Sequence, residues 1–437
     1  MYAQGRHRVE WLVVNARLCL AVTAILQLAL ACHPGPRAGT SPGPGIGAGD
    51  ATAEIELVET PPLETTLDHP DVANAADVWV AMIDGARRTI DFAEFYASEP
   101  GPGEHGGDAN PLSTVLAAIE RATARGVRVR FLADSIFAPK YPETLERLRR
   151  AGAQLRILDF APRGGGVLHA KYFVVDGAEA FVGSQNFDWR ALAHIQEIGV
   201  RVRSPEIASA LLDILETDWE LAAGAPAGTR VKRARMPAPG AWGEARAQTG
   251  ERVTLVASPK GWLPDESAWD LPKLVAMLDG AAHAIDVQVL TYKTKERDGS
   301  PFPTLDAALR RAAARGARVR LLVSDWASKP DSDSRQVLEA LAKLPNVEVR
   351  VITIPPWSRG DVPFARVAHA KYMVVDAATP AARAWIGTSN WEGDYFTRSR
   401  NVGVIVDAGA LPARLDRVFE DGWSGAYSKP LMTSPAP

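Results

Sequence analysis

The chain of 437 residues is poor in cysteine and has almost no excess of charge of either sign. Its two cysteines, Cys19 and Cys32, both lie near the start, so the rest of the chain can form neither a disulfide framework nor a cysteine metal cluster. The formal net charge of −3 excludes a strongly basic protein that grips nucleic acid mainly by charge. The 36 glycines and 32 prolines follow no period, which excludes collagen.

What the chain does contain is typical of a folded protein. Apolar residues make up 46% and charged residues 23%, so disorder through most of the chain is excluded. The length predicts two or three domains.

The first 31 residues are expected to be an export signal. Arg6, Arg8 and Arg17 precede a short apolar run that ends with small residues directly before Cys32. A cysteine at this point resembles a bacterial lipoprotein signal, in which a lipid on Cys32 would hold the mature protein in the cell envelope. Simple export and an uncleaved membrane anchor are the alternatives, although the run is short for a membrane span. The Pro/Gly-rich residues 32–54 are expected to form a flexible tether.

The body of the chain is a duplicated unit. Three sequence patterns recur in the same order, in segments 82–91 and 277–286, 122–132 and 312–322, and 168–176 and 368–376. Their offsets drift slightly, as expected of a duplicated domain altered by small loop changes. We therefore predict a first half over 55–223, a connecting segment over 224–252, a second half over 253–427 and a tail over 428–437.

Each half alternates strand and helix patterns. Residues 90–96 read as a strand, 112–126 carry apolar residues at helical spacing up to a glycine, and 127–133 alternate like a second strand. This alternation predicts an α/β fold in which each half is an α/β/α sandwich. The two tandem halves are expected to pack side by side.

One polar motif, H-x-K-x4-D, occurs once in each half and is followed by a turn of glycine, hydroxyl residue and asparagine. Its residues are His169, Lys171, Asp176 and Asn186 in the first half and His369, Lys371, Asp376 and Asn390 in the second. On a predicted strand, side chains two apart share a face, so the histidine and lysine of each motif are expected to face one cavity. A single motif could arise by chance or mark buried histidines beside structural ion pairs. Two copies at the same place in a duplicated unit argue against both.

These residue types suit the chemistry of phosphodiesters. Histidine can attack phosphorus when it is neutral and donate a proton when it is charged. Lysine and asparagine supply donors for the oxygens of a phosphoryl group. No cluster with metal-ligand spacing is visible, so neither a metal nor another cofactor is expected.

The paired motifs resemble the phospholipase D superfamily over nearly all of 55–427. Longer strings resemble one branch, the phospholipase D types three and four of animal endolysosomes; they are LVETPP, GVLHAKYFVVD, GSQNFDWRAL, FARVAHAKYMVVD and GTSNWEGDYF. This resemblance implies two α/β/α halves that share one active site across a pseudo-two-fold axis. It also implies 5′-exonuclease activity on single-stranded DNA and RNA, with lipid transphosphatidylation also attributed to the branch.

By the same resemblance, His169 would be the nucleophile that forms a phosphohistidine, and His369 would protonate the leaving oxygen and then activate water. Glu197 would orient the first histidine, and the equivalent position in the second half is Asn401. The phosphate would be held by Lys171, Lys371, Asn186 and Asn390. Asp176 and Asp376 belong to the motif, with support of the structure expected rather than proton transfer.

The substrate is left between two classes by the sequence. Phe187, Trp189, Trp391 and Tyr395 follow the asparagines and could stack bases, which favours single-stranded nucleic acid. The alternative is a phospholipase D or phosphatidyltransferase acting on the membrane that the lipid anchor would touch. A binding module without activity is disfavoured because both motifs are complete. No obligate protein partner is implied.

Overall fold

The computed structural model describes residues 53–101, 103–104, 110–231, 241–247, 250–330 and 332–432, which belong to one compact unit. The expected export signal with Cys32, most of the tether, part of the connecting segment and the end of the tail lie outside these ranges. Within them, no helix is both long enough and apolar enough to cross a membrane.

The first half is built on a mixed sheet. Within the described residues it has eight strands in the order β2-β1-β10-β8-β7-β3-β5-β6. Strands β3, β5 and β6 run parallel to one another, and β7 joins β3 antiparallel. The bounds are β1 (Glu54–Thr60), β2 (Ala73–Asn74), β3 (Thr89–Glu94), β5 (Arg128–Asp134), β6 (Gln154–Leu158), β7 (Lys171–Val175), β8 (Glu179–Gly183) and β10 (Glu197–Arg203), with β4 (Ala97–Ser98) and β9 (Phe187–Asp188) paired separately.

The second half repeats this topology. Its described residues form a nine-stranded sheet in the order β11-β12-β18-β17-β16-β13-β14-β15-β19. The run from β12 to β15 matches the run from β1 to β6 strand for strand, which confirms the predicted duplicated α/β fold. The bounds are β11 (Glu244–Arg246), β12 (Arg252–Ser258), β13 (Ala284–Val289), β14 (Arg318–Ser324), β15 (Val347–Ile352), β16 (Tyr372–Val375), β17 (Arg383–Gly387), β18 (Asn401–Asp407) and β19 (Ser428–Pro430).

The helices begin and end where the sequence supplies caps. In α2 (Pro111–Ala124), the Asn110 side chain accepts the N–H of Ser113, and Gly126 follows the helix with a φ of 87°. In α5 (Pro205–Ala222), the Ser204 hydroxyl accepts the N–H of Ile207. The remaining helices are α1 (Ala75–Gly85), α3 (Pro142–Arg150), α4 (Ala161–Gly164), α6 (Asp270–Gly280), α7 (Thr304–Ala314), α8 (Asp333–Ala342), α9 (Gly393–Thr397) and α10 (Ala410–Ser424), with 3-10 turns η1 (Glu266–Ala268) and η2 (Asp325–Ser328).

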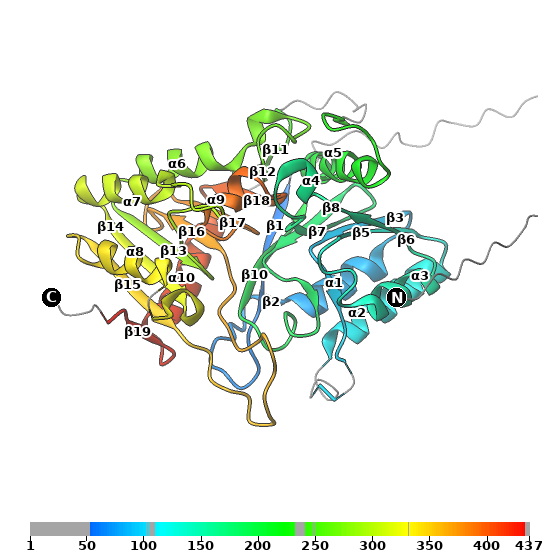
Figure 1. Ribbon diagram of the computed structural model, residues 1–437, viewed down its shortest axis with the longest axis horizontal. Helices are drawn as coiled ribbons and strands as arrows, with labels where there is room; N and C mark the ends of the chain where they lie inside the picture. The colour runs from blue at the N-terminus through cyan, green and yellow to red at the C-terminus, as the bar shows by residue number, and fades with distance from the viewer. Residues whose placement is uncertain are drawn as a thin grey trace, which may run out of the picture. The chain divides into compact units, whose positions relative to one another are not determined.

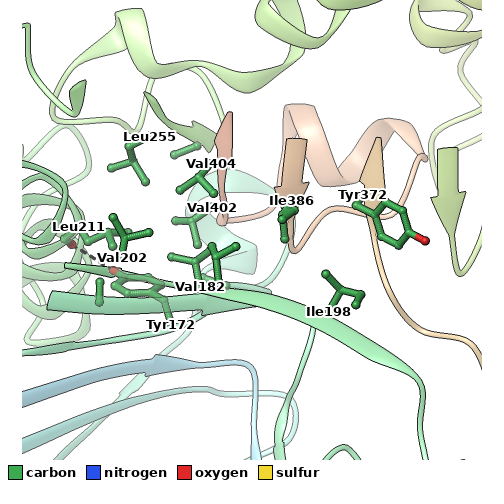
Figure 2. Close-up of a cluster of buried hydrophobic side chains, with 14 of the residues drawn as sticks. Tyr172, Val182, Ile198, Val202, Leu211, Leu255, Tyr372, Ile386, Val402 and Val404 are labelled. Atoms are coloured by element: carbon green, nitrogen blue, oxygen red, sulfur yellow. Dashed lines mark hydrogen bonds between the residues drawn. The ribbon is translucent and has the colours of Figure 1, made fainter. Parts of the chain in front are cut away.

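The sheets lie between outer helices and share one inner core. Helices α1 to α3 cover one face of the first sheet, and α6 to α8 cover one face of the second (Figure 1). The inner core joins both sheets with α5 and α10. Figure 2 shows its centre, where Val182 and Ile198 of the first sheet face Ile386, Val402 and Val404 of the second. Burial of this apolar surface fixes how the halves meet, and therefore how their motifs meet.

Candidate active site

The two motif histidines lie just before strands β7 and β16, not within them as the sequence predicted. Each is held by the backbone of the opposite half. The N–H of His169 donates to the carbonyl of Arg400 (2.9 Å), and the N–H of His369 donates to the carbonyl of Gln196 (2.9 Å). Because this exchange is reciprocal, the two motifs come together at one site on the pseudo-two-fold axis.

His169 is oriented by a neutral amide of the other half. Its Nδ1 lies 3.0 Å from Oδ1 of Asn401. The Nδ2 of Asn401 donates to the carbonyls of Tyr395 (2.8 Å) and Ser399 (3.3 Å), so its oxygen is the atom that faces the imidazole. Thr388 donates its hydroxyl to the same oxygen (2.8 Å). The imidazole is thereby a donor at Nδ1, which leaves Nε2 with a free electron pair.

His369 is oriented by a carboxylate. Its Nδ1 lies 2.8 and 2.9 Å from the two oxygens of Glu197, which is completely buried. The prediction that Glu197 orients His169 is therefore wrong. Glu197 and Asn401 begin β10 and β18, and their preceding residues, Gln196 and Arg400, are those that bond the opposite histidine backbone. A residue at the start of either strand consequently serves the other half.

The motif lysines lie beneath the histidines. Lys171 donates from Nζ to the carbonyl of His169 (2.7 Å), and Lys371 donates to the carbonyl of His369. Both lysines are buried. Each ammonium group is thus fixed by its own motif and keeps donors for an anion.

Two carboxylates that the sequence analysis missed belong to this site. Glu94 stands opposite Lys171 in the β3–β7 ladder, and its Oε2 has no hydrogen-bond partner among the described residues. Asp134 accepts the N–H of Leu168 (2.8 Å), next to His169. Each is the last residue of a parallel strand, β3 or β5. The carboxyl ends of such strands are where α/β sheets bind ligands, and that position was the available signal.

Burial dominates the electrostatics. It lowers the pKa of both His169 and His369 well below the usual value, and the neighbouring lysines add to this shift. Burial also lowers the pKa of Lys171 to about 7, although nearby carboxylates oppose it. It raises the pKa of Glu197 to about 8, against the influence of Lys371. A bound phosphate would bring the negative charge that such lysines lack.

The motif aspartates lie away from the histidines. Asp176 accepts the backbone N–H groups of Arg87, Arg88 and Thr89 at 2.7 to 2.9 Å. Asp376 does the same for residues 282–284 at 2.7 to 2.8 Å. Both aspartates come directly after the last residues of β7 and β16. This places them about 15 Å from the motif lysines, measured along the strand. They hold the turns before β3 and β13 and lie outside the cluster of motif histidines and lysines.

The motif asparagines follow β8 and β17, the strands that pair with β7 and β16, which begin at or directly after the motif lysines. Asn186 and Asn390 are buried, and neither side-chain oxygen has a hydrogen-bond partner among the described residues. Amides placed in this way are suited to turning their N–H donors toward a bound oxyanion.

Three of the four aromatic residues expected near the phosphate lie elsewhere. Phe187 and Trp189 are fully buried in the core beneath α1 and α2, and Trp391 is buried in the core of the second half. The fourth, Tyr395, has its ring 4.7 Å from that of His169. The other three pack into the hydrophobic cores because they follow strands whose outer faces are covered by helices.

The described residues contain no group of three or more His, Cys, Asp or Glu side chains arranged to hold a metal ion. The ring of His369 instead bonds a single carboxylate, that of Glu197, and the ring of His169 bonds the neutral amide of Asn401.

The sequence profile of the family described as "Cardiolipin synthase, PLD-like domain" matches residues 79–219 and 274–423. Similar curated proteins include "Phospholipase D Z" of Dictyostelium discoideum, 29% identical over 404 residues, which span 87% of this chain and 91% of that protein. The "5'-3' exonuclease PLD3" of Bos taurus is 31% identical over 413 residues (86% and 81%). The "5'-3' exonuclease PLD4" of Mus musculus is 30% identical over 418 residues (87% and 80%).

Two solved structures share the fold. Phosphatidylserine synthase from Haemophilus influenzae Rd KW20 superposes with a TM-score of 0.54 at 11% identity, covering 82% of this chain and 85% of that one. Polyphosphate kinase from Porphyromonas gingivalis gives 0.52 at 13% identity, covering 87% of this chain and 49% of that one. At these identities the likeness concerns the fold alone.

Proposed function

The chain belongs to the phospholipase D-like family and is a phosphodiesterase, and from this premise we propose that it is a metal-independent 5′-exonuclease of single-stranded DNA or RNA. The main support is the meeting of two histidines with different partners over two buried lysines. The curated relatives named as 5′-3′ exonucleases, about 30% identical over most of the chain, favour nucleic acid as the substrate.

In the first step, the free Nε2 of His169 attacks phosphorus. An N–P bond forms, the bond from phosphorus to the leaving oxygen breaks, and His369 gives that oxygen a proton. Lys171, Lys371 and the two motif asparagines hold the non-bridging oxygens, whose charge shifts during the transfer.

In the second step, water attacks the phosphohistidine. His369, now neutral, takes a proton from the water as the O–P bond forms. The N–P bond breaks and its electron pair returns to His169, which restores the enzyme.

The protonation states required by this mechanism can coexist. Burial and the lysines keep His169 neutral, as a nucleophile must be. His369 and Glu197 share one proton as a coupled pair, and the raised pKa of Glu197, about 8, keeps that proton on the pair at neutral pH. One imidazole is thus a base while the other has an acid's proton.

The alternative function is that of a phospholipase D or phosphatidyltransferase on membrane phospholipids. The relative named "Phospholipase D Z" favours it. A lipid on Cys32 would also hold the enzyme at a membrane of the cell envelope; this anchor and the export of the chain remain part of the proposal.

The deciding experiment uses the full chain in excess EDTA. Single-stranded oligonucleotides with free or blocked 5′ ends are incubated in parallel with vesicles of phosphatidylcholine and phosphatidylglycerol. We expect stepwise loss from free 5′ ends only, and none with His169→Ala. Release of headgroups with intact oligonucleotides would replace the exonuclease with the lipid enzyme. Loss of all activity in EDTA would contradict the metal-independent mechanism.

A further inference from the structure

A run of aromatic side chains leads away from His169 on the side of the first half. The ring of Phe95 lies 4.9 Å from that of His169, and the ring of Phe137 lies 4.5 Å from Phe95. Tyr96 stacks on Phe137 at 5.2 Å, and Tyr141 lies 5.4 Å from Tyr96. We call these four residues, Phe95, Tyr96, Phe137 and Tyr141, the aromatic strip.

The strip is not part of the hydrophobic core. All four side chains are half-buried, and none belongs to the core cluster under α1 and α2. They come from two loops, one after β3 and one after β5, at the carboxyl ends of parallel strands. Aromatic rings that stay partly exposed beside an active site are suited to contact with a ligand.

Among its described residues, the second half has no equivalent of the strip. The residues at the positions of Phe95 and Phe137 are Leu290 and Ala327, and both are buried. The duplication therefore preserved the phosphate-binding residues in both halves but the aromatic strip in only one. The phosphate-binding residues are symmetric, whereas the aromatic residues beside them are not. This difference indicates that the strip holds the part of the substrate on one side of the phosphate.

One exposed cation without an ion pair in the described part of the chain lies against the strip. Lys140 is exposed, and its Nζ lies 4.2 Å from the centroid of the Phe137 ring. No ion pair holds Lys140 among the described residues. A hollow of about 660 Å³ next to the strip carries both signs of charge. Its lining includes Glu143 and Glu146 as well as Arg149 and Arg150, and Arg149 forms an ion pair with Glu146. Proteins bind single-stranded nucleic acids by stacking aromatic rings on the bases and by placing cations near the phosphates. An acyl chain carries no charge that a cation could contact.

We propose that the aromatic strip is a binding subsite for the bases of a single-stranded nucleic acid, next to the phosphate under attack at His169. The inference rests on the proposed nuclease function and adds where the strand lies. Bases stack on the half-exposed rings, and Lys140 contacts the backbone phosphate between them.

The test compares variants of the full chain on two substrates. Phe137→Leu keeps the apolar volume but removes the ring, and it spares Phe95, which touches His169. Trp326→Ala is the matched control, because Trp326 is 38% exposed in the corresponding turn of the second half. The ratio of kcat/KM for a single-stranded oligonucleotide to that for bis(p-nitrophenyl) phosphate, which has no bases, is measured for each.

We expect this ratio to fall roughly tenfold in Phe137→Leu, the usual effect of losing one base–aromatic contact. It should not change in Trp326→Ala. An abasic residue at one early position of the oligonucleotide should lower the ratio of the unaltered chain by a similar factor, and the two changes combined should do little more than either alone.

Equal ratios in Phe137→Leu and Trp326→Ala would overturn the inference. So would a loss seen with phosphatidylglycerol vesicles but not with oligonucleotides, since the strip would then serve an acyl chain. If the unaltered chain hydrolyses bis(p-nitrophenyl) phosphate but no oligonucleotide, the proposed nuclease function itself fails, and this result is distinct from the other two.

Discussion

Glu197 and Asn401 occupy equivalent positions in the two halves, yet one is a carboxylate and the other a neutral amide. A carboxylate stabilises a charged imidazole more strongly than a neutral amide oxygen does, and the bond from Asn401 raises the pKa of His169 too little to offset burial. This one difference separates the proposed proton donor, His369, from the proposed nucleophile, His169. On this proposal, the two copies of a duplicated motif have different roles.

Glu197→Gln should therefore impair proton donation more than nucleophilic attack. We expect a loss of about 10²- to 10⁴-fold with an alkoxide leaving group, the usual share of general acid catalysis. The basic limb of the pH–rate profile, expected near pH 8 from the pKa of Glu197, should move to lower pH, since His369 alone has a lowered pKa.

The measurement is kcat/KM against pH on an oligonucleotide, with bis(p-nitrophenyl) phosphate as the comparison. Nitrophenolate leaves without a proton, so Glu197→Gln should still give a rapid first release followed by slow turnover. An unchanged basic limb would show that Glu197 does not share a proton with His369.

Asp176 belongs to the H-x-K-x4-D motif but lies away from the two histidines. Asp176→Asn tolerates the positive φ of 53° but replaces a carboxylate oxygen that accepts a backbone N–H. We expect the free energy of unfolding to fall by about 1–3 kcal/mol while kcat of the folded protein is retained. Denaturant unfolding and kinetics are measured on the same samples. A kcat as low as that of His169→Ala would show that Asp176 is needed for the reaction itself.

At the scale of elements, a buried ion pair positions one histidine. Arg400 forms a bidentate pair with Asp218 of α5 at 2.8 and 2.9 Å, and both side chains are fully buried. The carbonyl of Arg400 accepts the N–H of His169, and its own N–H donates to Val167. Helix α5 of the first half thus holds the start of β18, which in turn holds the first motif.

Asp218→Leu should leave the Arg400 charge buried without its partner. We expect a loss of about 3–5 kcal/mol in the free energy of unfolding, measured by denaturant titration. Asp279→Ala, which breaks an exposed pair with Arg311, is the control and should cost less than about 1 kcal/mol. Equal effects of the two substitutions would mean that water reaches Arg400.

The elements were largely predictable from local patterns. Apolar periodicity and glycine stops predicted the strand at 90–96, the helix at 112–126 and the strand that follows. The same local reasoning began the motif strands two or three residues too early, so that they included His169 and His369. Those residues are held by backbone bonds to the opposite half, and pairing between residues so far apart in the sequence leaves no mark on hydrophobic alternation.

At the scale of the whole molecule, the family resemblance implied one shared site but not which residue serves which motif. The assignment of Glu197 to His369 depends on how the halves meet, which packing of the shared inner core decides (Figure 2). The fate of Trp189 and Trp391 likewise depends on which sheet faces are covered. Such facts belong to tertiary packing and could not be read from spacing.

A further link between the halves is the segment 353–367, whose Trp357 and Val362 pack into the core of the first half. Trp357 lies 4.8 Å from the ring of His194, and the N–H of Arg366 donates to the His194 carbonyl (3.1 Å). His194 is fully buried, and neither ring nitrogen has a hydrogen-bond partner among the described residues. Burial, with Arg366, lowers its pKa to about 4.

This histidine should make the contact between the halves sensitive to acid. Between pH 6.5 and about 4 the unfolded chain binds a proton at His194 that the folded chain does not, so the free energy of unfolding falls as the pH falls, by about 3 kcal/mol at most. Other groups titrate in the same range, and a comparison with His194→Phe isolates the effect.

The difference in unfolding free energy between this variant and the unaltered chain should grow in favour of the variant as pH falls through that window. A constant difference for His194→Phe would mean that the folded protein accommodates the charged imidazole, and that acid does not act on the contact between its halves at this residue.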